Sequence, residues 1–132
     1  MDLGSRRHQA RERALELLYE AEMKSRSALE IVRELPVAPD DYTITLVEAA
    51  QSHRERAEAL VAEFSHDWPL ERLAVIDRLI MVLAIGELLS EDAPPTAVVL
   101  NEAVELARTY STEGSGAFVN GVLSSCARHL ER

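Results

Sequence analysis

The chain has 132 residues, of which 47% are hydrophobic and 28% charged, and its formal net charge is -9. This composition is typical of one globular domain, and the acidic excess disfavours a protein that binds nucleic acid or an anionic membrane over its whole surface. Cys126 is the single cysteine, which excludes an intrachain disulfide and a cysteine-based metal site. The polar, basic start and the lack of an apolar run of ~18 residues predict a cytoplasmic protein.

The charge is unevenly distributed along the chain. The first thirteen residues hold four arginines and two acidic residues, a sum of +2, so the remaining residues must sum to -11. A polyanion would therefore have to bind at the N-terminal end.

Two helices are predicted at the start of the chain. Residues 5–25 lack proline and glycine and carry small and apolar side chains at steps of three and four, which predicts an amphipathic helix. Ser27 and Glu30 have the spacing of a capping box, so a short helix is expected over residues 28–35. The prolines that follow end it.

The next segment is predicted as one long or bent helix that ends near Ser65. Asp40 or Asp41 can cap its start. Residues 42–46 alternate apolar and polar side chains, as a strand does, but apolar residues continue at helical spacing as far as Phe64. This length favours the helix.

A central helix is predicted over residues 70–89. Trp68 and Pro69 mark a break and a restart, because proline is tolerated at the first helical position. The residues that follow are largely apolar with few charges, which predicts a helix buried on nearly all sides. Gly86 costs about 1 kcal/mol relative to alanine inside a helix, so it indicates a close helix crossing.

Two more helices complete the prediction. Pro94 and Pro95 end the central helix, and residues 97–110 return to the helical period. Residues 111–116 read as a flexible turn, and a final helix is expected over residues 118–130. The chain is therefore predicted to be all-α, with six or seven helices in one domain that covers residues 1–132.

No catalytic residue, metal site or cofactor is predicted, because the common motifs for metal, nucleotide and nucleophile chemistry are missing. His66 and Asp67 could contribute to a metal site, but they fit a helix-ending turn better. Cys126 lies on an apolar stripe and reads as a buried hydrophobic residue. Glu102 and Glu105 lie side by side on one helix, so they are interpreted as a solvated face or a contact surface.

The first helix carries a basic end. Arg7 and Arg11 are four residues apart and share a face, while Arg6 and Arg13 share a neighbouring one. Guanidinium groups contact phosphate bidentately and stack on unpaired bases, which suits single-stranded RNA. The alternative, equally compatible with the sequence, is a solvated helix start whose arginines pair with nearby glutamates, namely Glu12, Glu16 and Glu20.

A second candidate is the turn of Gly114, Ser115 and Gly116. Its small residues would free backbone N–H groups at the start of the last helix for an anion, and Phe118 could stack on a base. The simpler interpretation, a serine N-cap followed by a core phenylalanine, is favoured by the residues alone.

Three segments resemble, in the same order, the motifs of the NusB family of transcription antitermination factors. They are residues 6–20 (RRHQARERALELLYE), 101–107 (NEAVELA) and 118–123 (FVNGVL). Parts of residues 68–78 also resemble the middle of the family, so the resemblance spans nearly the whole chain.

The resemblance implies an all-helical fold of two small packed bundles, with no catalysis. Family members bind the boxA element of nascent RNA jointly with the ribosomal protein NusE, and help RNA polymerase to read through terminators, notably in ribosomal RNA operons. The positions that match the family's RNA surface are Arg6, Arg7, Gln9, Arg11, Ser115 and Phe118. Those that match the surface facing NusE are Tyr19 and Glu87.

The charge distribution and three departures from the family pattern bear on these partners. NusE is basic in this family picture, so the acidic remainder of the chain is complementary to it. Gly114 stands where relatives often carry an acidic residue, and Val82 and Gly86 stand where many carry arginine and an aromatic residue. The family includes both monomers and homodimers.

Two other functions are compatible with parts of the sequence. A NusB-like domain also forms the RNA-binding half of some 5-methylcytosine RNA methyltransferases, but such enzymes need a further Rossmann-like domain, which we do not expect in a chain of this length. An acidic helical module that binds only proteins would be favoured if the arginines proved dispensable.

Overall fold

The computed structural model describes residues 2–66 and 68–132. The regular structure of this described part consists of seven α-helices and one turn of 3-10 helix, which confirms the all-α prediction. The elements are α1 (Leu3–Lys24), α2 (Ala28–Glu34), α3 (Asp41–Ser52), α4 (Arg54–Phe64), η1 (Leu70–Arg72), α5 (Val75–Leu89), α6 (Thr96–Tyr110) and α7 (Ser115–His129). None of these helices is both long and apolar enough to span a bilayer.

Side-chain caps define the starts of the first three helices. Asp2 accepts a hydrogen bond from the backbone N–H of Ser5, and Ser27 accepts one from that of Glu30, as the capping-box spacing predicts. Asp40, rather than Asp41, caps α3 by accepting from the N–H of Tyr42. The two predicted N-terminal helices are therefore confirmed, with α1 beginning two residues earlier than expected.

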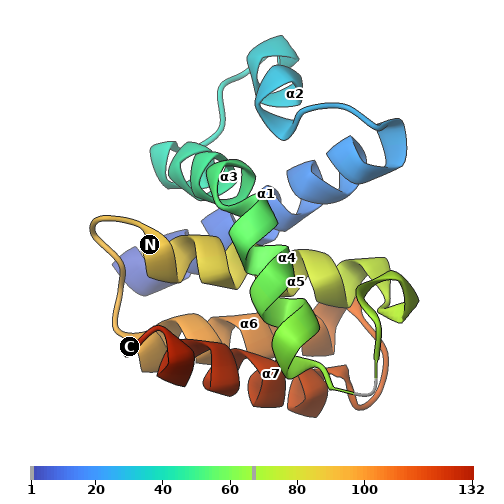
Figure 1. Ribbon diagram of the computed structural model, residues 1–132. Coiled ribbons are helices and arrows are strands. Elements are labelled where there is room, and N and C mark those ends of the chain that lie inside the picture. The colour runs from blue at the N-terminus through green and yellow to red at the C-terminus, as the bar shows by residue number, and fades with distance from the viewer. Residues whose placement is uncertain (1, 67) are drawn as a thin grey trace.

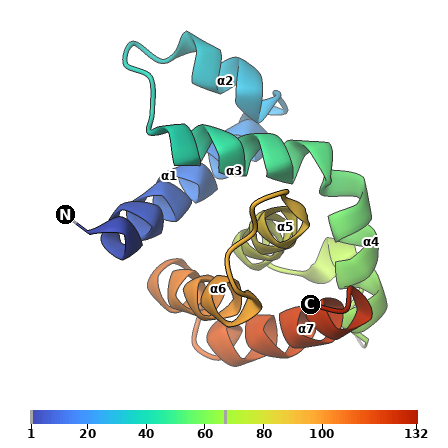
Figure 2. The ribbon, with the colours of Figure 1, turned by 90° about the vertical axis from the view of Figure 1, so that its left-hand side faces the viewer.

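The segment predicted as one long or bent helix is divided at His53. Figure 2 shows α3 and α4 meeting there at a sharp angle. His53 has φ of -103° and ψ of 10°, so its backbone leaves the helical range and redirects the chain. No proline or glycine marks the position, which explains why the side-chain period continued without a visible break.

Two predicted boundaries were wrong. Pro69 precedes only the single turn η1, and the central helix α5 begins at Val75 after a second extended residue, Ala74. The last helix begins at Ser115 and not at residue 118, because Gly114, with φ of +90°, is itself the N-cap. A left-handed backbone of this kind favours glycine.

Helix α5 lies at the centre of the molecule. It packs on α1 and α3 on one side and on α4, α6 and α7 on the other, and Figure 2 shows it almost end-on between them. Every residue from Leu79 to Leu88 is buried. The helices thus form two groups, α1–α3 and α4–α7, that share this helix (Figure 1).

The predicted close crossing at Gly86 is confirmed. A Cβ atom at this position would lie 2.9 Å from the backbone nitrogen of Ala50 on α3 and 3.0 Å from the carbonyl carbon of Ala49. Only glycine allows α3 and α5 to approach this closely. The crossing holds the C-terminal part of α3 against α5.

Candidate nucleic-acid interface

A buried ion pair joins α1 to α5. The guanidinium of Arg11 donates to both carboxylate oxygens of Glu87, from Nε at 2.9 Å and from a terminal nitrogen at 2.7 Å. Arg11 is 3% exposed and Glu87 2% exposed. Bidentate geometry of this kind is the form in which a charge pair is best stabilised away from water.

Tyr42 of α3 connects this pair to the surface. Its hydroxyl donates to Glu87 at 2.5 Å, and its ring lies under the guanidinium of Arg7, whose Cζ is 4.6 Å from the ring centroid. Burial, reinforced by the neighbouring carboxylate of Glu87, raises the pKa of Tyr42 to about 12. The phenol therefore stays protonated and acts as a donor at neutral pH.

Arg7 is held in a way that leaves its hydrogen-bonding edge available. The contact with Tyr42 places the guanidinium over the aromatic ring, and the side-chain hydrogen bonds and ion pairs of the described residues do not use its N–H donors. No carboxylate pairs with Arg7 among the ion pairs of the described residues. An ordered guanidinium with free donors is suited to a phosphate or to the edge of a base.

The structure separates the residues that were predicted to contact RNA on the first helix. Arg6 and Gln9 are exposed and Arg7 is half-buried, whereas Arg11 has almost no accessible surface. The side chains of Arg11, Glu87 and Tyr42 form a column beneath Arg7. An RNA would reach the guanidinium of Arg11 only if α1 separated from α5. Tyr42, which completes that column, was not among the predicted residues.

The proposed pairing of the arginines with glutamates of their own helix is not what the structure shows. Arg6 instead lies 3.4 Å from Asp40 in an exposed pair, and Arg11 uses Glu87, with Glu102 at 3.8 Å. Glu12 accepts from the hydroxyl of Tyr110 at 2.9 Å. The basic end is therefore not neutralised along α1.

His8 links the same end of α1 to α6. Its Nδ1 lies 2.7 Å from a carboxylate oxygen of Glu102, and its Nε2 lies 3.7 Å from Glu12. The hydrogen bond to Glu102 raises the pKa of His8 above its ordinary value. Glu102 is therefore engaged by α1 within the protein, which neither interpretation predicted, whereas Glu105 is exposed as expected for a solvated face.

The second predicted site, at the start of α7, is built around a buried carboxylate. The hydroxyls of Ser111 and Ser115 donate to the two oxygens of Asp77, at 2.6 and 3.0 Å. Ser115 is 5% exposed, and its own backbone N–H donates to Thr112. Ser115 therefore fixes the turn to α5 instead of presenting a free donor, and it is not the N-cap.

Phe118 is half-buried and packs against the core, but it also borders a hollow of about 410 Å³. Trp68, which is 54% exposed, and Arg72 line the same hollow. Trp68 and Arg72 therefore add aromatic and cationic character to the surface around Phe118, and neither was among the predicted site residues. In Figure 1 the start of α7 and the N-terminal end of α1 lie on opposite sides of the view.

The two residues predicted to face a protein partner differ in accessibility. Tyr19 is 40% exposed on α1, whereas Glu87 is enclosed by Arg11 and Tyr42. They do not form one surface. Tyr19 is left as the accessible member of the pair.

Cys126 and the pair His66 and Asp67 are the residues that the sequence offers for a nucleophile or a metal site. Cys126 is fully buried, as predicted, and burial raises its pKa to about 11, so the thiolate is disfavoured. Residues 2–66 and 68–132 contain no cluster of side chains suited to hold a metal ion. Asp67, half of the metal alternative, lies outside the described residues.

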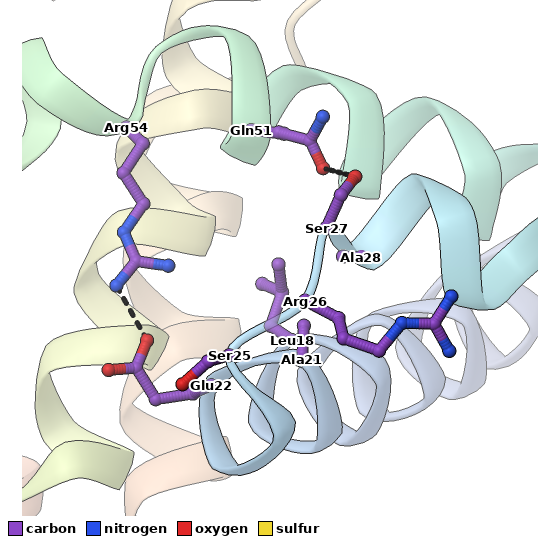
Figure 3. Close-up of a pocket in the computed structure, with 9 residues that line it drawn as sticks. All are labelled: Leu18, Ala21, Glu22, Ser25, Arg26, Ser27, Ala28, Gln51 and Arg54. Atoms are coloured by element: carbon purple, nitrogen blue, oxygen red, sulfur yellow. Dashed lines mark hydrogen bonds and ion pairs between the residues drawn. The ribbon is translucent and has the colours of Figure 1, made fainter.

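A hollow of about 390 Å³ lies at the far end of α1, where α2 and the junction of α3 and α4 meet it (Figure 3). Four of its polar side chains are paired with one another. Arg54 donates to Glu22 at 2.7 Å, and Ser27 donates to Gln51 at 3.0 Å. These bonds connect the helices that line the hollow, and we assign it no ligand.

Comparison with known proteins identifies the family of the chain. The NusB family model matches residues 8–128. The chain is 41% identical over 128 residues to the transcription antitermination protein NusB of Saccharopolyspora erythraea, covering 92% of this chain and 86% of that protein.

Solved structures show the same fold. NusB of T. maritima superimposes with a TM-score of 0.82 at 29% identity, covering 92% of this chain and 90% of that one. A second structure, of the antitermination factors NusB and NusE in complex with dsRNA, gives a TM-score of 0.79 at 26% identity over 95% of this chain and 98% of that one. These relatives are non-enzymatic factors, and the chain belongs with them to the NusB family of transcription antitermination proteins.

Proposed function

We propose that this chain promotes antitermination by holding boxA-type RNA and NusE together in the complex that forms with RNA polymerase. In this proposal Arg6, Arg7, Gln9 and Phe118 contact the RNA directly. Arg11, Ser115 and Glu87 act from beneath the surface by ordering those residues. Tyr19 contacts NusE. The unit that acts is the whole of residues 1–132, working in the cytoplasm where transcription takes place.

The ordered position of Arg7 is the observation that carries the proposal. Its guanidinium is stacked on Tyr42, which is itself fixed by Glu87. A cation that is already ordered loses little side-chain entropy when it meets a phosphate, so binding is stronger than for a mobile arginine. Placement of the RNA, not chemistry, is the mechanism.

The charge distribution supports two partners on one molecule. The first thirteen residues sum to +2 and the remainder to -11, so an RNA and a basic protein would be attracted to different parts of the surface. A similar structure holds the antitermination factors NusB and NusE in complex with dsRNA, which supports a protein and an RNA as partners of one complex. Because each partner would contact the other as well as this chain, their affinities should be coupled.

The test is a fluorescence anisotropy titration of a labelled boxA-type RNA. It is run with and without NusE at two salt concentrations, against a scrambled single strand and a duplex of the same length. We expect NusE to increase the affinity for the boxA-type strand by about fivefold or more, which corresponds to a coupling of ~1 kcal/mol. Higher salt should weaken binding.

Arg7→Ala is the variant that tests the site. It should weaken RNA binding and reduce the salt dependence by about one phosphate contact. Sizing of the same samples would detect a homodimer, which would matter if it covered α1. A folded protein that binds no RNA even with NusE present would leave a module that binds proteins only.

A further inference from the structure

A groove of about 430 Å³ lies beside the basic end, between α1 and the turn that enters α3. Arg6, Gln9 and Arg13 form one wall, and Pro39 and Asp40 form the other. The three α1 residues are spaced by three and four positions, so they lie in a row on one face of the helix. The groove is within the usual size range of small-molecule sites, ~300–1,000 Å³.

The floor of the groove is apolar and tightly packed. Ala10 and Thr43 line it and are 3% and 1% exposed. The hydroxyl of Thr43 donates to the backbone carbonyl of Ala10 at 3.4 Å, so it is not left to bind a ligand. The floor therefore offers no free hydrogen-bonding group, while the polar side chains stand at the rim.

Cationic groups dominate that rim. Arg13 is half-buried, and the ion pairs of residues 2–66 and 68–132 do not include it. Arg6 pairs with Asp40 at 3.4 Å, but both side chains are well exposed, at 60% and 44%. An exposed ion pair is weak and exchanges readily, so Arg6 can move from Asp40 to another anion.

We propose that this groove holds one unpaired nucleotide of the RNA, with Arg13 as a further binding residue. The base lies on the floor formed by Ala10 and Thr43 and against the wall at Pro39. The amide of Gln9 meets the edge of the base, and Arg6 and Arg13 contact the flanking phosphates. This inference rests on the proposed function and extends it from the face of Arg7 to the α3 side of α1.

The shape and the chemistry both favour a single strand. A base can enter the groove only when it is not paired, and an apolar floor with amide and guanidinium groups at the rim matches the recognition of splayed bases. An acidic peptide would satisfy the cations but would leave the apolar floor without a flat partner. We therefore commit to RNA and make the peptide an outcome of the test.

The experiment compares Arg13→Ala with Arg56→Ala. Arg56 is an exposed arginine of α4 that is also absent from the ion pairs of the described residues, so its loss changes the net charge equally at a distant place. The probe is a labelled single-stranded boxA-type RNA, with a duplex of the same sequence as comparison. Far-UV circular dichroism and thermal unfolding confirm that each variant folds.

We expect Arg13→Ala to weaken binding of the single strand about tenfold and to lower the slope of log affinity against log salt by about one, while Arg56→Ala leaves both unchanged. Arg13→Lys, which keeps the charge, should restore part of the loss. RNAs that carry an abasic site at successive positions should bind the wild type more weakly when the missing base is the one held in the groove. For that RNA, Arg13→Ala should cause little further loss of affinity, because both changes remove the same contact.

Several results would overturn the groove assignment. In one, the wild type binds RNA and Arg7→Ala does not, but Arg13→Ala binds with the affinity and salt dependence of the wild type. Another is a glutamate-rich peptide whose binding depends on Arg13 when RNA binding does not. A wild type that binds no RNA under any condition instead removes the proposed function, and the groove proposal with it.

Discussion

Glu87 illustrates how a single residue can be recognised in the sequence and still be assigned the wrong environment. Its position on the central helix matched a partner-facing residue, but three hydrogen bonds, two from Arg11 and one from Tyr42, occupy its carboxylate inside the protein. Arg11 and Glu87 are 76 residues apart, so no local pattern reveals that they meet. Tyr42 is hidden for the same reason.

Substitution of Tyr42 should separate the two roles of its side chain. Tyr42→Leu removes the ring under Arg7 and should weaken RNA binding by about threefold to tenfold, because a stacked cation contributes ~0.5–1 kcal/mol or more and the guanidinium becomes mobile. Tyr42→Phe keeps the ring and should bind RNA nearly as well as the wild type. Anisotropy titrations of the two variants in parallel would measure the difference.

Tyr42→Phe should also lower the stability of the protein, which can be measured on the same samples. It leaves Glu87 with one donor fewer, so the free energy of unfolding should fall by about 1–2 kcal/mol even where RNA binding is retained. Equal RNA affinities for the Leu and Phe variants would contradict the role assigned to the stacked ring.

His8 should make the stability of the protein depend on pH. Its pKa is raised in the folded state, chiefly by the hydrogen bond to Glu102, with Glu12 adding to the effect and Arg11 opposing it. The ion pair therefore stabilises the fold fully below the unfolded pKa of ~6.5 and loses this contribution as the pH rises through the higher folded pKa. Since the ring is 37% exposed, the effect should stay below about 1 kcal/mol.

The measurement is urea denaturation of the wild type and of His8→Ala at about pH 6 and about pH 8. The difference in unfolding free energy between the two proteins should be larger at the lower pH. A difference that does not change, or that grows with pH, would show that the His8 to Glu102 contact is not ionic.

At the scale of the elements, the crossing of α3 and α5 is the contact that the sequence predicted most clearly. A glycine in an otherwise apolar helix indicates a close approach, and here a Cβ atom would lie only 2.9 Å from the backbone of Ala50 and 3.0 Å from that of Ala49. The break at His53 gave no such sign, since the backbone turns there without a residue that favours a turn.

Gly86→Ala should therefore destabilise the protein although alanine is the better helix former. The added Cβ would lie 2.9 Å from a backbone atom that cannot move alone, and overpacking of this kind costs ~1–3 kcal/mol, more than the ~1 kcal/mol gained in helix propensity. Chemical denaturation would measure the change.

Gly121→Ala is the matched control. This glycine lies in α7 with no atom within 4 Å of its added Cβ, so the same substitution should stabilise the fold by up to about 1 kcal/mol. If both variants were stabilised, the close approach of α3 to α5 would be refuted.

The helices themselves were largely predictable from the sequence. Each predicted helix corresponds to one or two observed ones, because an apolar stripe at helical spacing is a local property that burial then exploits. The ends were less predictable. The start of α7 depends on the unusual backbone of Gly114 and on the bond from Ser115 to Asp77, and both require the tertiary contact with α5.

For the molecule as a whole, the Arg11 to Glu87 pair joins the two groups of helices through α1 and α5. Arg11→Ala would leave a carboxylate buried without its cation, and the free energy of unfolding should fall by about 3–5 kcal/mol. The double variant Arg11→Met with Glu87→Gln removes both charges and keeps an acceptor for Tyr42. This double variant should recover at least half of the unfolding free energy that Arg11→Ala loses.

Urea denaturation of the single and double variants would test this coupling. If the double variant were no more stable than Arg11→Ala, the loss would come from missing contacts rather than from an unpaired charge. A variant of Arg11 is for this reason a poor probe of RNA binding, and Arg7 and Arg13 are the informative positions.

The place of α5 between both helix groups also has a consequence for how the protein unfolds. Neither group has a complete core without this helix, since its buried side chains from Leu79 to Leu88 contact both. Partial opening that releases one group while the other stays folded is therefore unfavourable, and the amide protons of α5 should exchange with solvent only when the entire chain unfolds. An RNA bound at the tip of α1 would slow that exchange in α5 as well, so the most protected amides would report on occupancy at a surface they never touch.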